Sequence, residues 1–289
     1  MNAIEFKKYI EEYLGSVARL HGIKNLERYY ENTDLLISEI NQLENNSIQQ
    51  TFAQFILHAQ NARYINNIVK FTENYEFLKE ITRQFSPKDF LNRFEYESEN
   101  DREESVNSIV EALRYDENTN PNGLRWNNRE GNRRDIIVKR FANSLIDGAV
   151  YLENFQDKQA VIEDLKIHYD SVRNLISYTE GEFRHGFSVA LCCDFLKELS
   201  PTFDLPKPDV HIMETLAKYM GHDRNYYKNS QNRAYECIND FLKLVEKIKE
   251  IDPHMTAYKL DRQIWLCCTG NFFLDTTFNI KRSFLNGIN

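Results

Sequence analysis

The sequence predicts an all-α protein, and three observations lead to this class. Apolar residues recur at intervals of three or four along most of the chain, which is the period of an amphipathic helix. The 289 residues include only 10 glycines and 6 prolines, too few for the many turns of a β-sandwich or barrel. No convincing stretch alternates apolar and polar residues as a half-buried strand does.

The expected helices follow one another along the chain. The first has Phe6, Ile10, Tyr13, Leu14 and Val17 on one face, with charged residues between them. The pattern returns over 48–71. Further helices are expected at about 132–154, 158–179, 187–200, 209–220, 231–250 and 255–270, with boundaries set to within about four residues.

Two polar stretches, 95–104 and 115–131, predict loops because they are rich in Asn, Asp and Glu, with Pro and Gly in the second. The second contains Trp126 between Arg125 and Arg129. An aromatic ring among arginines can stack on a base or sugar. The alternative is that Trp126 packs onto the protein and anchors the loop.

The charge of the chain is acidic, with 36 basic and 44 acidic side chains and a formal net charge of −8. Any nucleic-acid binding would therefore depend on a local basic patch. The most basic window is 125–140, which includes Arg133 and Arg134. It predicts either phosphate contacts or a solvated helix face with acidic partners elsewhere.

The five cysteines, an odd number, are expected to be buried, reduced thiols. No C-x-x-C pair or other ligand spacing predicts a metal, and we expect no cofactor. No apolar run approaches the roughly 20 residues that span a bilayer, and the first residues lack the features of a signal peptide. We therefore expect a cytoplasmic protein without a membrane partner.

Residues 181–221 are the most informative segment. A tight turn at Arg184-His185-Gly186 opens an apolar helix at Phe187, with Ser188 in its first turn. Free N–H groups and the positive dipole end of a helix bind anions such as a DNA phosphate, and Gly allows close approach. Pro206 and Pro208 keep the chain before the next helix rigid and extended. Asp209 falls at the start of that helix, either as its N-cap or as a carboxylate that takes part in chemistry.

This pattern resembles the helix-hairpin-helix DNA glycosylase superfamily, through Gly-Phe-Ser-Val-Ala, an apolar helix and Pro-Asp-Val-His-Ile. The resemblance implies one unit over 1–289 with two lobes and an active cleft between them. Lobe one would comprise 1–50 and 205–289, and lobe two 51–204 with the hairpin at 183–200. It also implies that hairpin N–H groups bind a phosphate and that Asp209 excises a base. The turn departs from the family's Gly-hydrophobic-Gly.

Two other stretches are similar to the same superfamily. In 52–71, Gln60 and Asn61 occupy the turn that supplies a polar wedge where the base is extruded. Residues 258–266 resemble the late helix that closes the base pocket. A narrower resemblance is to the alpha-glutamyl/putrescinyl thymine pyrophosphorylases, a branch associated with hypermodified phage bases. It includes members that resemble amino acid:DNA transferases and others that look like phage-defence glycosylases.

The resemblance implies a DNA partner, double-stranded and carrying modified bases, and a monofunctional hydrolase, because residues 174–182 lack the lyase lysine. Lys207 would be a nucleophile, a phosphate contact or simply solvated. His211 would pack in the cleft, hydrogen-bond a backbone carbonyl or line the base pocket. Asp261 and Trp265, four residues apart, would either line that pocket or form a buried packing face. The alternatives are a base-modifying transferase and a non-catalytic module that binds modified DNA.

Overall fold

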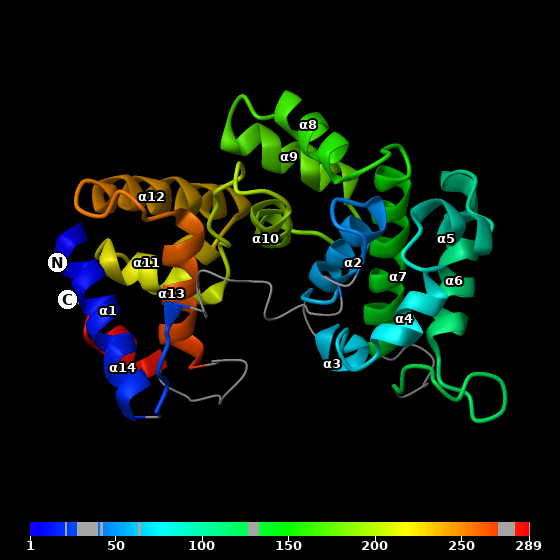
Figure 1. Ribbon diagram of the computed structural model, residues 1–289, viewed down its shortest axis with the longest axis horizontal. Coiled ribbons are helices and arrows are strands. Elements are labelled where there is room, and N and C mark those ends of the chain that lie inside the picture. Colours follow the sequence, from blue (N-terminus) through cyan, green and yellow to red (C-terminus); the bar gives the residue numbers. More distant parts are fainter. Residues whose placement is uncertain are drawn as a thin grey trace. The chain divides into compact units, whose positions relative to one another are not determined.

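The computed structural model describes residues 1–20, 22–27, 40, 43–62, 65–126, 133–270 and 281–288 (Figure 1). All regular elements within these ranges are helices, and the β-pairing described is limited to three isolated bridges. The all-α prediction is therefore confirmed. None of the described helices is long and apolar enough to cross a membrane.

The chain folds into two compact units. Unit 1 consists of Met1–Leu36 and Leu196–Asn289, and unit 2 of Ile37–Phe195. The helices of unit 1 are α1 (Ala3–Leu20), α11 (Val210–Tyr219), η5 (Tyr226–Lys228), α12 (Gln231–Lys249), α13 (Ala257–Thr269) and α14 (Lys281–Asn286). Those of unit 2 are α2 (Ile48–Ala59), α3 (Asn66–Val69), α4 (Tyr75–Ile81), α5 (Pro87–Arg93), η4 (Glu99–Asp101), α6 (Arg102–Leu113), α7 (Arg133–Leu152), α8 (Lys158–Ile167) and α9 (Val172–Glu182). Helix α10 (Val189–Leu199) contributes residues to both.

Helix α13 is central to unit 1, where it contacts α1, α11, α12 and α14 (Figure 1). The predicted stripe of α1 packs into this core, with Phe6, Ile10 and Leu14 at most 2% exposed. All five cysteines of the chain are buried thiols that form no disulfide bond, as expected. Burying these apolar faces is the main contribution to the stability of such helices.

Helix α7 has the corresponding place in unit 2 and contacts α2, α5, α6 and α9. The ring of Phe55 in α2 lies in an aromatic cluster with Phe183, Phe187 and Phe195. Aromatic pairs at such distances add stability beyond the area they bury. This cluster joins α2 to the turn between α9 and α10.

Side-chain caps explain where seven of the described helices begin. A Ser, Thr or Asp oxygen accepts a backbone N–H at the starts of α2, α5, α8, α9, α11, α12 and α13. The single helix expected over 158–179 is two helices, because the first ends at His168 and Ser171 caps the second. The polar stretch 95–104 is only partly a loop, since it contains η4 and the start of α6.

Candidate functional site

Asp209 is the N-cap of α11. Its Oδ1 accepts hydrogen bonds from the backbone N–H of His211, at 2.7 Å, and of Ile212, at 3.0 Å. Its Oδ2 accepts no hydrogen bond from the residues that the structure describes, and the side chain is only half-buried. Asp209 therefore has the capping role, with one carboxylate oxygen left for another interaction.

Asp261 lies in α13 and is buried. Its Oδ2 accepts from the Lys197 ammonium at 2.8 Å and from the Lys207 backbone N–H at 2.7 Å. Burial raises the pKa of the Asp261 carboxyl, the Lys197 charge opposes this, and the charge of Asp209 adds to it. Of the two interpretations of Asp261, the structure shows the satisfied carboxylate in a packing face, so reading a base edge is wrong for this residue.

The other residues predicted near Asp209 are half-buried. The His211 N–H is used in the cap of α11. The Trp265 ring lies 5.5 Å from the Arg262 guanidinium carbon and packs against the core of unit 1. The Lys207 backbone is held by Asp261. These residues share unit 1 with Asp209.

The turn between α9 and α10 is held from within unit 2. The His185 N–H donates to Asp147 Oδ2 at 2.8 Å, and the His185 Nδ1 lies 2.9 Å from Asp147 Oδ1. Asp147 is 2% exposed and also pairs with Arg102. Arg184 pairs with Glu99 at 3.0 Å. The expectation that the turn offers its N–H groups to a phosphate is wrong for His185, because Asp147 already occupies that donor.

The start of α10 is the part of this segment with N–H groups to offer. The backbone N–H groups of Ser188, Val189 and Ala190 donate to no described acceptor, as is usual in the first turn of a helix. Ser188 is exposed, whereas Phe187 is a core residue stacked on Phe55 with ring centroids 4.7 Å apart. The side chain of Phe187 is therefore part of the core, and its backbone N–H donates to the Phe183 C=O at 3.1 Å.

Gly186 is required by packing. A Cβ atom at this position would lie 1.6 Å from Ser144 Oγ and 2.8 Å from Ser144 Cβ, both on α7. Contacts this short do not occur without a shift of the surrounding structure. The sequence interpretation assigned the glycine to close approach of a phosphate. The structure gives it a different reason, the close approach of α7.

The predicted wedge residues differ in their environment. Gln60 is buried, and its Oε1 accepts the Phe71 N–H at 2.8 Å. A side chain held in this way is not available to enter DNA, so that prediction is wrong for Gln60. Asn61 is exposed just after α2, so its role as a polar wedge stays a prediction.

The basic window 125–140 is described only in part. Residues 127–132, which include Arg129, and the side chain of Arg133 lie outside the described residues, and Arg134 is exposed on α7. Trp126 is buried, and its Nε1–H donates to Asp135 at 2.9 Å. Of the two interpretations of Trp126, the structure shows the one in which it anchors its loop.

Sequence reasoning missed three side chains that hold the candidate segments in place, Lys197, Asp147 and Asp204. The available signal for Lys197 was its place four residues after Cys193, on the apolar face of α10. No comparable signal marks the two aspartates, because their partners are 38 to 54 residues away in the sequence.

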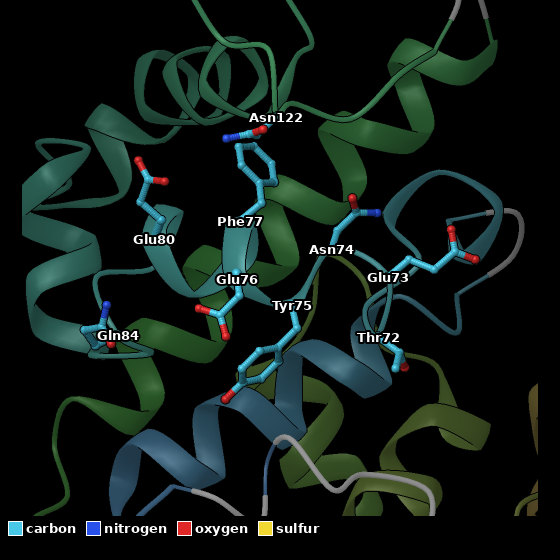
Figure 2. A pocket seen from close by; sticks show the side chains of 9 residues that line it. All are labelled: Thr72, Glu73, Asn74, Tyr75, Glu76, Phe77, Glu80, Gln84 and Asn122. Atoms are coloured by element: carbon cyan, nitrogen blue, oxygen red, sulfur yellow. The ribbon is translucent and has the colours of Figure 1, made fainter.

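A cavity of about 670 Å³ lies in unit 2 and contains none of the predicted site residues. Figure 2 shows the carboxylates of Glu73, Glu76 and Glu80 around it, together with the rings of Tyr75 and Phe77. Three carboxylates repel a phosphate backbone. This cavity is therefore not the place where we look for a DNA contact.

Comparisons with known proteins found no match to a family model, to a curated protein or to a solved structure. Within the described part of the chain, no three His, Cys, Asp or Glu residues are grouped so as to hold a metal ion. The surroundings of Asp209 are thus the arrangement from which a function can be argued.

Proposed function

We propose that this protein is a monofunctional DNA glycosylase of the helix-hairpin-helix type, in which Asp209 drives hydrolytic release of a modified base. The observation that carries the proposal is the state of Asp209. One carboxylate oxygen is fixed by two N–H groups at the start of α11, while the other is engaged by no described residue. The likeness of residues 181–221 to that superfamily supports the same assignment.

The chemistry needs one carboxylate. As the bond between C1′ and the base nitrogen breaks, its electron pair leaves with the base and positive charge develops on the sugar. The free oxygen of Asp209 would stabilise this charge and accept a proton from a water molecule, whose oxygen then bonds to C1′. The proton passes to the departing base. The products are a free base and an abasic site in an intact strand.

The DNA would be held by local contacts, since the whole chain carries a net charge of −8. The candidates supported by their exposure are the first N–H groups of α10 and the side chains of Arg184, Asn61 and Arg134. The base must leave the DNA double helix to reach a carboxylate, and this costs a few kcal/mol. Stacking of the base on an aromatic side chain in the pocket offsets about 1–3 kcal/mol of this cost. The two-lobed glycosylase fold with a cleft is part of this proposal.

We infer a bulky, hypermodified phage base as the target, and a role in defence against phage, from the likeness to the thymine pyrophosphorylase branch. A transferase acting on the same DNA would leave an altered base in an intact strand. A binding module would give no product. The three functions therefore differ in what remains of the DNA.

The test incubates the protein with unmodified DNA and with phage genomes carrying different modified bases. Mass spectrometry identifies released bases, and alkali reveals abasic sites. We expect base release from at least one modified DNA, and its loss in Asp209→Asn with DNA affinity unchanged. Asp157→Asn is the matched control, because Asp157 caps α8 in the same way in unit 2. Activity of Asp209→Asn within about tenfold of the parent, or about 1.4 kcal/mol in the barrier, would exclude Asp209 from the mechanism.

The monofunctional mechanism has a separate test. Borohydride reduces the imine that a lyase amine forms with C1′, and we expect no trapped protein–DNA adduct. An adduct that disappears in Lys207→Ala would replace hydrolysis by amine attack.

A further inference from the structure

We propose that Asp261 positions Asp209 by holding the backbone of the linker, residues 200–209, which leads from α10 into α11. This inference rests on the proposed function, in which Asp209 acts on DNA. Asp261 itself is 3% exposed, so it touches no substrate and is a positioning residue.

Helix α13 fastens the linker at two points. The Asp204 carboxylate accepts the N–H of Ala257, at 2.9 Å, and of Tyr258, at 2.8 Å, at the start of α13. One turn further along α13, Asp261 accepts the N–H of Lys207. A carboxylate of the linker thus accepts backbone N–H groups of α13, and a carboxylate of α13 accepts a backbone N–H of the linker.

The hydrogen bond from the Lys207 N–H to Asp261 lies two residues before Asp209, the N-cap of α11. Pro206 and Pro208 have no N–H, so Lys207 and Asp209 supply the only backbone donors of residues 206–209. The Asp209 N–H bonds locally to the Lys207 C=O at 2.7 Å. The bond from Lys207 to Asp261 is therefore the one backbone N–H contact that ties 206–209 to another element.

Lys197 brings α10 to the same oxygen. Its ammonium is 2.8 Å from Asp261 Oδ2, and both side chains are at most 4% exposed. Removing one partner of a buried ion pair is strongly destabilising, so single replacements of either residue would mix a loss of stability with a loss of positioning. Removing both charges together avoids this penalty.

Two double variants separate the hydrogen bond from the ion pair. Both carry Lys197→Met, and they differ only in Asp261→Asn or Asp261→Leu. Asn keeps an oxygen for the Lys207 N–H, whereas Leu has a similar volume and no acceptor. Circular dichroism and thermal unfolding confirm that both fold.

Two measurements follow. The first is amide hydrogen exchange of residues 207–212, including the two N–H groups that bind Asp209. We expect exchange at least tenfold faster in the Leu variant than in the Asn variant. The second is base release at saturating DNA. We expect the Asn variant within about threefold of the parent, and the Leu variant at least tenfold slower with the same Kd for DNA.

Equal exchange in the two variants would overturn the positioning by Asp261, whatever the activity. Faster exchange with equal release rates would also overturn it, because Asp209 would then act without the contact. If the parent releases no base from any DNA, the proposed function fails instead, and the exchange result separates the two failures.

Discussion

Gly186→Ala is expected to destabilise unit 2, because α7 already occupies the space of the added methyl group. The new Cβ would lie 1.6 Å from Ser144 Oγ and 2.8 Å from Ser144 Cβ. Rotation of the hydroxyl relieves the first contact but gives up its hydrogen bond to the Arg140 C=O at 3.0 Å, worth about 1 kcal/mol. The contact with Ser144 Cβ remains in every rotamer. Overpacking of this kind costs about 1–3 kcal/mol, which is the loss of unfolding free energy we expect.

The assay is urea unfolding followed by circular dichroism, on the parent, Gly186→Ala, Ser144→Gly and the double variant. Ser144→Gly removes both contacting atoms, so the double variant should recover most of the lost unfolding free energy. A loss of about 1 kcal/mol should remain, because a glycine inside α7 lowers the stability of that helix. Gly181→Ala in α9 is the matched control, because nothing lies within 4 Å of its added Cβ. This control should be neutral or more stable by up to about 1 kcal/mol.

DNA affinity decides between the two reasons for the glycine. Packing alone predicts that the double variant recovers both stability and DNA binding. If stability returns and binding does not, the methyl group blocks a phosphate, as the sequence interpretation had it. If Gly186→Ala is as stable as the parent, the packing argument is refuted.

Three further outcomes are expected. Asp209→Ala should lose about 1 kcal/mol of stability as a helix cap, whereas Asp209→Asn should lose only a few tenths, and equal unfolding midpoints would contradict the cap. Burial raises the pKa of the Cys192 and Cys267 thiols well above the usual value, and all five cysteines are buried, so Ellman's reagent should label five thiols in denaturant and none rapidly in the folded protein. Trp126→Phe should cost about 1 kcal/mol through loss of the hydrogen bond to Asp135, and unfolding in urea that matches the parent would show that this bond does not anchor the loop.

The sequence by itself determined the helical class and most of the long helices. Periodic apolar residues and short-range caps are local properties, so α1, α2, α7 and α10 to α13 could be read from neighbouring residues. Helices α4 to α6 were not predicted. For α6 the reason is that segment 95–104, which contains its start, is rich in charge, and polarity alone does not distinguish a loop from a helix whose buried face is narrow.

Tertiary structure decided the roles of the candidate residues. Whether a carboxylate is free or satisfied depends on partners distant in the sequence, such as Lys197 and Asp261, 64 residues apart. The reason for Gly186 is likewise a residue of α7, and Gln60 is held by Phe71. Periodicity specifies which face of a helix is buried, but not what that face meets. The place of Asp209 at the start of α11 was foreseen because capping is local, whereas its link to Asp261 requires the packing of α13 against the linker.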